Sequence, residues 1–256
     1  MTESPRSRAK TTETSLSIIQ TLKDFDGATI EELADALDLA PSTIHRHLVS
    51  LREHRFVTKR GEQYQIGLQF LTFGGYAQRQ VIGFPMIKEK VEELAQQTGE
   101  HAQFVVEEEG ERVYLYTATG DRAVHTGANI GKRGEIHTSA AGKAILACLP
   151  EDGVDKIIER HGLGQSTERS ITDRTTLLEE LETVRTRGYA INLEETTKGV
   201  HAVGAAVTTP DGRPLGALSV SGPANRVREE ELRGELVELV LGLVNELELH
   251  IEHAIL

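Results

Sequence analysis

The chain has 256 residues, 38% hydrophobic and 27% charged, and 40 Asp or Glu against 28 Lys or Arg give it a net charge of −12 at pH 7. This length suits two domains, no apolar run is long enough to span a membrane, and no signal peptide precedes residue 15, so we expect a cytoplasmic protein. Cys148 is the only cysteine, which excludes an intramolecular disulfide and any multi-cysteine zinc site.

The first part of the chain predicts a small helical domain. Residues 1–11 are expected to form a disordered lead and residues 12–24 a helix, whose inward face carries Leu16, Ile19 and Leu22. Thr29 and Glu32 have the spacing of a capping box, which predicts the start of a second helix. The apolar stripe of that helix is expected to consist of Leu33, Ala36 and Leu37.

A third helix is expected to begin at Pro41, because the N–H that proline lacks would be unpaired at that position anyway. Its inward residues recur at helical spacing, at Ile44, Leu48 and Leu51. The opposite face is then polar and cationic, with Ser42, Thr43, His45, Arg46 and His47. Such a helix pair is typical of a helix-turn-helix that reads the major groove of DNA, although an amphipathic helix pair without a nucleic-acid partner has the same pattern.

Two further features favour DNA. Residues 56–58 and 64–66 alternate as strands around a basic tip at residues 59–62, so residues 12–67 predict a winged helix-turn-helix domain. Residues 41–60 hold five Lys or Arg against one Glu, whereas residues 81–256 hold 18 Lys or Arg against 30 Asp or Glu, an acidity typical of a high-salt cytoplasm. We expect base contacts from Ser42, Thr43, His45 and Arg46, and phosphate contacts from Arg52, Arg55, Lys59 and Arg60.

The rest of the chain predicts a second domain. Residues 68–84 are expected to form a linker helix with a break, because the segment contains several glycines and precedes Pro85. Residues 85–256 mix hairpin strands with helices, so this domain is α+β. The expected strands are 101–108, 112–119, 124–128, 189–192, 201–208 and 215–221, and the expected helices are 85–98, 139–148, 152–161, 173–187 and 225–253.

Two places in this domain are candidate ligand contacts. The small residues at Ala140 and Ala141 lead into a helix, whose first N–H groups attract anions, but close packing against a strand gives the same pattern. Ser219 and Ser221 lie two apart on a strand, so their hydroxyls share one face, as they also would at an ordinary strand end. The histidines are scattered singly and no catalytic set is evident, so we expect no metal, no other cofactor and no catalytic residues.

In order and spacing, these segments resemble the IclR-type transcriptional regulators. The resemblance covers about residues 12–253 and rests on STIHRHL, a linker helix, HTSAAGK, RGYAINLEE, KGVHAVGAAV and LGALSVSGP. It implies that the C-terminal domain is a GAF/profilin-like α/β sensor with an antiparallel sheet, which binds small and often carboxylate-bearing metabolites. Carried over by position, the effector contacts are Ala140 and Ala141 through backbone N–H groups, Asn192, Val200, Ala202, Ser219, Ser221, Ala123 and Thr126.

Two positions depart from the family pattern. Asn192 stands where relatives use an Asp or another polar group, and Ala202 stands where some have a cysteine. The pocket is therefore expected to be less charged than in relatives that bind small keto acids, and to accept a sugar acid or another neutral-to-acidic metabolite.

We expect a transcriptional regulator of catabolic genes that is controlled by a small carboxylate, such as a keto acid or sugar acid. It should bind a pseudo-palindromic operator in double-stranded DNA as a homodimer, and the resemblance also implies tetramers, as dimers of dimers. The alternatives are a metabolic enzyme that uses the C-terminal pocket, with the winged helix as an interaction module, and an architectural DNA-binding protein without a ligand.

Overall fold

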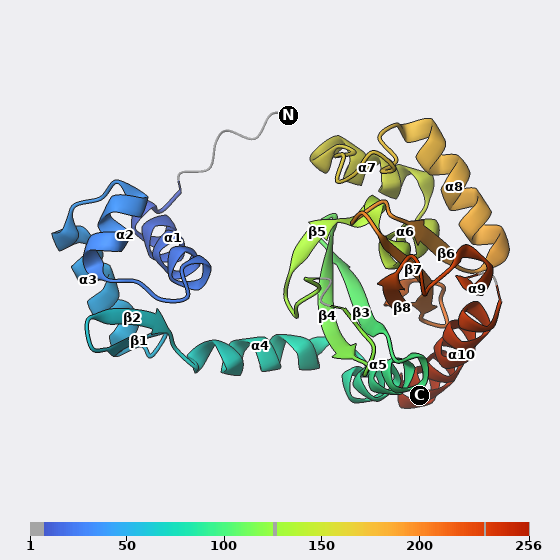
Figure 1. The fold of residues 1–256 in the computed structure, drawn as a ribbon, viewed down its shortest axis with the longest axis horizontal. Helices are drawn as coiled ribbons and strands as arrows, with labels where there is room; N and C mark the ends of the chain where they lie inside the picture. The colour runs from blue at the N-terminus through green and yellow to red at the C-terminus, as the bar shows by residue number, and fades with distance from the viewer. Residues whose placement is uncertain (1–7, 125–126, 233, 256) are drawn as a thin grey trace. The chain divides into compact units, whose positions relative to one another are not determined.

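The computed structural model describes residues 8–124, 127–232 and 234–255 (Figure 1). The chain divides after Ala77 into two compact units, each of which is described by itself. None of the helices in these residues combines the length and the apolar character that crossing a bilayer requires.

The first unit is the predicted winged helix-turn-helix. Its core consists of residues from all three helices and the hairpin, including Ile18, Leu33, Ile44 and Leu48, which are fully buried. The elements are α1 (Lys10–Asp24), α2 (Ile30–Leu37), α3 (Pro41–Glu53), β1 (Val57–Arg60) and β2 (Gln63–Ile66). The strands pair antiparallel, with Val57 opposite Ile66.

Both predicted helix starts are confirmed. The Glu32 N–H donates to Thr29 Oγ1 at 3.2 Å, and the Thr29 N–H donates to Glu32 Oε2 at 2.8 Å, so the capping box is complete. Pro41 is the first residue of α3. Its backbone needs no N–H donor there, because the first turn of a helix has no internal acceptor for it.

The inward face of α1 differs from the prediction. Leu16 is 59% exposed and Ile19 is half-buried, whereas Ile18 is fully buried with Leu22 four residues later. Periodicity allows both sets, and tertiary packing decides between them. Ser15 lies on the buried side, where its hydroxyl is 2.8 Å from Nδ1 of His47, which is therefore half-buried and engaged.

The same correction applies to α2. Ala34 is buried where Ala36 was expected, and Ala36 is exposed. Ala34 and Ala36 lie one and three residues after Leu33, and both positions are next to the buried face of the helix that Leu33 defines. Periodicity therefore does not decide between them.

The linker helix α4 (Gln69–Gln80) follows the hairpin and continues through Gly74. Its first turns contact Phe56, whose ring centroid lies 5.0 Å from that of Phe70 and 5.5 Å from that of Phe73. The helical run is interrupted at residues 81–83, and α5 (Phe84–Thr98) then ends at Gly99, whose φ of +68° is a left-handed conformation that glycine adopts without strain.

Within the described residues, the second unit is built on one six-stranded antiparallel sheet in the order β5-β4-β3-β8-β7-β6, which confirms the predicted α+β class. The turn between β3 and β4 has positive φ at Glu109 and Gly110, as a two-residue hairpin requires. The strands are β3 (His101–Glu108), β4 (Glu111–Thr119), β5 (Arg133–Glu135), β6 (Ala190–Leu193), β7 (Val200–Thr208) and β8 (Pro214–Pro223).

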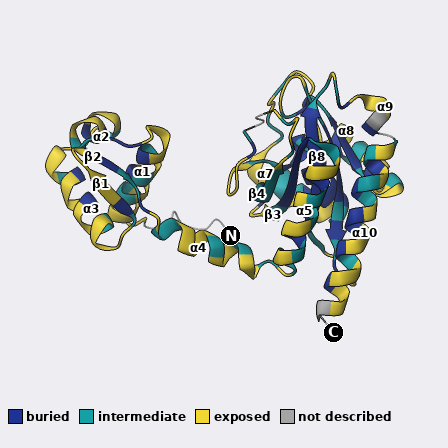
Figure 2. Cartoon of the chain, turned by 60° about the horizontal axis from the view of Figure 1, so that its bottom comes forward, coloured by how far each residue is buried: buried dark blue, intermediate teal, exposed yellow. Residues whose placement is uncertain are grey.

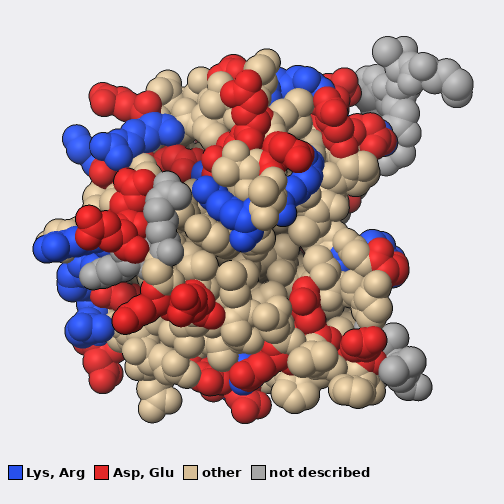
Figure 3. All heavy atoms as spheres, turned by 90° about the vertical axis from the view of Figure 1, so that its right-hand side faces the viewer, with Lys and Arg blue, Asp and Glu red and all other residues tan. Residues whose placement is uncertain are grey.

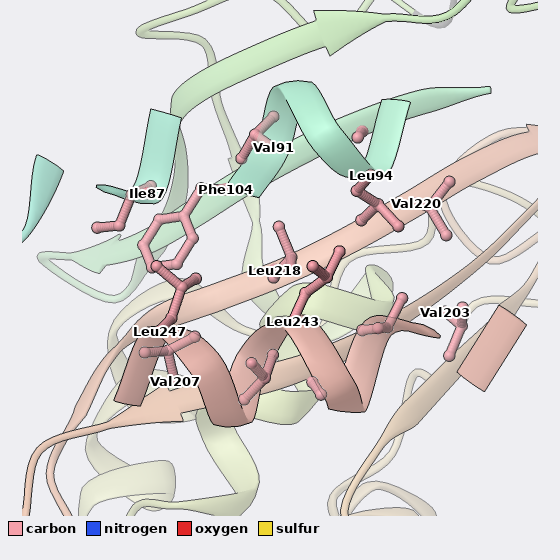
Figure 4. Close-up of a cluster of buried hydrophobic side chains, with 14 of the residues drawn as sticks. Ile87, Val91, Leu94, Phe104, Val203, Val207, Leu218, Val220, Leu243 and Leu247 are labelled. Carbon is pink, nitrogen blue, oxygen red and sulfur yellow. The ribbon is translucent and has the colours of Figure 1, made fainter. Parts of the chain in front are cut away.

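Helices cover both faces of this sheet (Figures 1 and 2). On one face, α5 and α10 (Glu235–Ile255) bury Leu94, Leu243 and Leu247 against Phe104 and Leu218 (Figure 4). On the other face lie α6 (Ala140–Ala147), α7 (Glu151–His161) and α8 (Arg174–Arg187). The start of α6 therefore packs against the second face of the sheet.

Two predicted elements of this unit are wrong. Val124, Gly127 and Ala128 are not in a strand, and His125 and Thr126 lie outside the described residues. The edge strand is β5 instead, which pairs with the start of β4. The long helix expected over 225–253 is α9 (Glu229–Leu232) and α10 (Glu235–Ile255), with Gly234 between them. Glycine is a poor helix former, so this is a favourable place for an interruption.

Candidate functional site

The outer face of α3 carries the residues predicted to read bases. Ser42, His45 and Arg46 are exposed and Thr43 is half-buried, because Ile44 and Leu48 on the opposite side are fully buried. Among the described residues, no acceptor bonds the Arg46 guanidinium. The face therefore presents a free cation and short polar side chains on a helix of 13 residues.

The predicted phosphate contacts lie at the end of α3 and on the hairpin. Arg52, Arg55 and Lys59 line one shallow groove, whereas Arg60 is an exposed residue at the end of β1. Lys59 is partly engaged, since its Nζ lies 3.2 Å from Glu62. Arg55 has a φ of +64°, a left-handed conformation that is unfavourable for residues other than glycine.

The second unit holds a cavity of about 80 Å³ between the start of α6 and the sheet. Seven of the nine predicted effector contacts line it, namely Ala140, Ala141, Asn192, Val200, Ala202, Ser219 and Ser221. Ala123 does not line it and is half-buried in the loop after β4. Thr126 lies outside the described residues, although its neighbour Gly127 lines the cavity.

The start of α6 has open N–H groups. Ser139 caps the helix, because its Oγ accepts from the Gly142 N–H at 3.0 Å and its carbonyl accepts from the Lys143 N–H at 2.9 Å. Among the described residues, the Ala140 and Ala141 N–H groups have no acceptor. Ala140 and Ala141 line the cavity, where a helix N-terminus favours an anion.

Close packing also keeps this segment small. A Cβ on Gly142 would lie 1.8 Å from the carbonyl oxygen of Ile136, and one on Gly204 of β7 would lie 3.0 Å from the Ala141 nitrogen. Both explanations of the small residues therefore hold, because the backbone of α6 approaches its neighbours closely and still leaves two N–H groups open.

Ser219 and Ser221 share one face of β8 and belong to a polar row that includes β3. Gln103 lies opposite Ser219, and His101 lies opposite Ser221. Gln103 Nε2 donates to Ser219 Oγ at 2.8 Å, which leaves the Ser219 proton available for a ligand. Gln103 was not predicted, although its alternation with His101 on a predicted strand was a usable signal.

Asn192 lines the cavity but its amide is engaged within the protein. Its Nδ2 donates to the Thr138 carbonyl at 2.7 Å and to Thr196 Oγ1 at 2.9 Å, and its Oδ1 accepts from the Glu195 N–H at 2.9 Å. These bonds hold the end of β6 against the segment that precedes α6. Asn192 therefore shapes the wall of the cavity and offers little free bonding capacity to a ligand.

Two cations at the cavity were also missed. Arg112 and Lys132 line it together with Tyr114, and none of the residues that line it is an Asp or Glu. On the outer surface, by contrast, acidic side chains are spread among Lys and Arg (Figure 3). On an acidic chain, a cavity without an acid is suited to an anion.

A buried ion pair lies behind the cavity. Lys143, which is 2% exposed, places its Nζ 2.7 Å from Glu195 Oε1 and 3.4 Å from Glu180 Oε1. Burial raises the pKa of Glu195, although Lys143 opposes that shift. Glu195 Oε2 is buried without a partner among the described residues, so the pair is a costly arrangement that depends on the lysine.

Comparisons with known proteins agree on one family. Residues 12–61 match the IclR helix-turn-helix domain, and residues 80–248 match the bacterial transcriptional regulator IclR C-terminal domain. A Halobacterium salinarum protein named "Probable HTH-type transcriptional regulator ArcR" is 35% identical over 241 residues, which cover 93% of this chain and 92% of the relative.

Two solved structures are similar in fold. The crystal structure of Thermotoga maritima IclR has a TM-score of 0.83 at 24% identity and covers 95% of this chain and 99% of its own. The inducer-binding domain of an Acinetobacter PobR double mutant, in complex with 3-hydroxybenzoic acid, has a TM-score of 0.59 at 30% identity. It covers 63% of this chain and 94% of its own.

Proposed function

The chain belongs to the IclR family of transcriptional regulators, and we propose that α3 reads an operator while a small carboxylate in the cavity beside α6 controls that binding. Members of the family are DNA-binding regulators with a C-terminal effector-binding domain and are not enzymes, so the enzymatic alternative is set aside. We assign DNA binding to residues 12–67, the connection to residues 68–84 and effector binding to residues 85–256.

One observation carries the effector proposal: among the described residues that line the cavity, several donors have no acceptor in the protein, and none is an Asp or Glu. The Ala140 and Ala141 N–H groups are open, the Ser219 hydroxyl proton is available, and Val200 and Ala202 add an apolar wall. A carboxylate bound to these donors would form charge-assisted hydrogen bonds, which are stronger than neutral ones. The small volume favours a compact keto acid or sugar acid, and the PobR complex supports a carboxylate by analogy.

Control of DNA binding requires a difference in affinity. The acid must bind one arrangement of the two DNA-binding units of a dimer more tightly than another, because a ligand with equal affinity for both shifts nothing. We place this coupling in the connection at residues 68–84. We infer that the controlled genes encode catabolism of the acid or its precursor.

Replacing both cavity serines by alanine is expected to weaken the response to the acid by about tenfold or more, because hydrogen bonds to a charged group contribute about 1.5–3 kcal/mol each. Duplexes selected by the protein from a random DNA pool would be titrated by fluorescence anisotropy, with and without 2-keto acids and sugar acids. The Ser219→Ala, Ser221→Ala variant should bind these duplexes with unchanged affinity when no acid is present.

Thr175→Ala, at an exposed position on α8, is the matched control and should respond like the natural protein. Loss of DNA binding by the serine variant in the absence of acid would contradict the proposal, since the hydroxyls would then be needed for the fold rather than for the ligand.

We propose that the chain forms a dimer, both because a pseudo-palindromic operator has two half-sites and because the linker region exposes large apolar side chains. Leu68, Leu71, Phe73 and Tyr76 are each at least 56% exposed, which is unusual for large apolar side chains this close together in sequence. A second copy of the chain would cover them. A dimer of such dimers would give the tetramer that the family resemblance implies.

Introducing charge on this surface is expected to dissociate the dimer. The Leu71→Lys, Tyr76→Lys variant should sediment as a monomer in analytical ultracentrifugation at concentrations where the natural chain is dimeric, because an interface cannot bury unpaired ammonium groups cheaply. Leu249→Lys, at an exposed leucine of α10, is the control. A Leu71→Lys, Tyr76→Lys variant that stays dimeric would contradict this interface, and a natural chain that is monomeric at every concentration tested would contradict the dimer itself.

A further inference from the structure

Arg112 is a buried cation that has no anionic partner among the residues that the structure describes. The residue is 7% exposed, and its Nε donates to the Glu135 carbonyl at 3.0 Å while its Nη1 donates to the Tyr114 hydroxyl at 2.5 Å. Both acceptors are neutral, and no carboxylate among the described residues forms an ion pair with it. Three of the five N–H donors of a guanidinium are then left without a protein acceptor. Because a buried charge without a counter-ion is costly, this arrangement points to an anion from outside the chain.

The surrounding residues hold the guanidinium at the cavity. Arg112 and Tyr114 lie two apart on β4 and share one face, and the guanidinium carbon is 5.2 Å from the centre of the tyrosine ring. Gly134 on the neighbouring strand leaves room for it, since a Cβ there would lie 2.8 Å from Arg112 Nη2. Lys132 adds a second positive charge, with its Nζ fixed by the Gly127 carbonyl at 2.8 Å. These contacts restrict the arginine before any ligand binds, so less conformational freedom is lost on binding.

The two sets of donors lie at different places along the sheet. Gln103 is opposite Ser219, and Val105, two residues further along β3, is opposite Tyr114. Two residues of a strand span about 7 Å, which exceeds the distance between the two oxygens of one carboxylate. The Ser219 end and the Arg112 end therefore offer places for two separate anionic groups. A ligand that satisfies both ends has two anionic groups joined by a short chain.

We propose that the effector is a short-chain dicarboxylate, with one carboxylate at Ala140, Ala141 and Ser219 and the other on the Arg112 guanidinium, assisted by Lys132. This inference rests on the proposed effector site and narrows the class of acid that it binds. Arg112 would then determine specificity, because its planar fork matches a carboxylate in a way that a neutral amide group does not.

The test compares each diacid with its own monoamide, which has nearly the same shape and one charge fewer. Malonate, succinate and glutarate, and their monoamides, would be titrated into the full chain by isothermal calorimetry at constant ionic strength. At least one diacid should bind with a Kd about tenfold or more lower than that of its monoamide. The monoamide lacks one charged group and so loses the charge-assisted hydrogen bonds to Arg112, and a tenfold change in Kd corresponds to about 1.4 kcal/mol. Arg112→Gln should abolish this preference, because it should weaken the binding of the diacid and leave the affinity for the monoamide nearly unchanged.

Arg133→Gln is the matched control, because Arg133 is the exposed neighbour that pairs with Glu108 and Glu111 on the surface. It should keep the preference. If Arg112→Gln does not fold, Arg112→Lys keeps the charge without the fork, and it should lower the preference for the diacid.

The outcomes separate the two proposals. The dicarboxylate proposal would be overturned if monoamides and simple monocarboxylates bound as tightly as the diacids. If that binding required Ser219 and Ser221, the proposed function would still stand. A diacid preference that survives in Arg112→Gln, or that is undiminished in Arg112→Lys, would also overturn the dicarboxylate proposal. Failure of every acid to bind would overturn the proposed carboxylate site itself.

Discussion

Replacing Lys143 by methionine is expected to lower the free energy of unfolding by about 3–5 kcal/mol, the usual cost of removing one partner from a buried ion pair. The ammonium is the only cation recorded beside Glu195 within the described residues, and Glu180 lies within 3.4 Å of it as well. Methionine fills nearly the same space, so the loss would come from the carboxylates rather than from a cavity. Urea unfolding of the full chain, followed by circular dichroism, measures it.

The control is the same substitution at an exposed pair. Lys156 lies 2.9 Å from Asp152 on α7, and both side chains are more than 70% exposed. Solvent screens such a pair, so Lys156→Met should leave the unfolding midpoint nearly unchanged. Equal effects of the two substitutions would show that burial does not distinguish the pairs and would contradict the prediction.

The effect should also depend on pH. Burial raises the pKa of Glu195 in the folded chain above the ordinary pKa of a glutamate, which it has in the unfolded chain. At a pH between these two pKa values, the folded chain holds more protons than the unfolded chain. The contribution of this carboxyl to stability therefore falls as the pH rises through that window. Without Lys143, ionisation of the Glu195 carboxyl costs more free energy in the folded chain. The loss of free energy of unfolding caused by Lys143→Met should therefore be smaller at pH 5 than at pH 7. A deficit that is constant or larger at pH 5 would contradict this cause.

Local features of the fold were predictable because each depends on a few neighbouring residues. The capping box at Thr29 and the helix start at Pro41 each combine a specific residue type with a fixed spacing. The same holds for Ser219 and Ser221, which must share a face of any strand that contains both. Where two local patterns fit equally well, as with Ile18 and Leu16 in α1, tertiary contacts decided.

The missed parts of the site are non-local. Arg112 on β4 donates to the Glu135 carbonyl on the neighbouring strand β5, and Gln103 meets Ser219 across 116 residues of sequence. Lys143 and Glu195 are 52 residues apart. Strand order and register set these distances, and neither is expressed in the periodicity of a single segment.

The break between α9 and α10 was missed for a different reason. Its only local signal is Gly234, and a helix tolerates one glycine at a cost of about 1 kcal/mol. The apolar spacing through residues 232–251 continues on both sides of the interruption, so a pattern of inward residues alone favours one long helix.

Arg46→Ala is expected to weaken binding to selected duplexes by at least about tenfold, because a bidentate contact between an arginine and a base contributes about 1–3 kcal/mol of discrimination. In a dimer each protomer would lose this contact. The fold should be unaffected, since the Arg46 side chain is exposed and the surrounding helix is held by Ile44 and Leu48. Fluorescence anisotropy at several salt concentrations, with selected and scrambled duplexes, measures the effect.

Arg52→Ala separates base reading from phosphate binding. Arg52 is expected to contact the backbone, so its loss should weaken binding to selected and scrambled duplexes alike and reduce the salt dependence by about one ion per contact. Arg46→Ala should instead reduce mainly the difference between the two duplexes, since only a base contact distinguishes sequences. If Arg46→Ala behaves as Arg52→Ala is expected to, then Arg46 binds phosphate, and sequence reading must lie with Ser42, Thr43 and His45. Unchanged binding by Arg46→Ala would show that the outer face of α3 is not the reading surface.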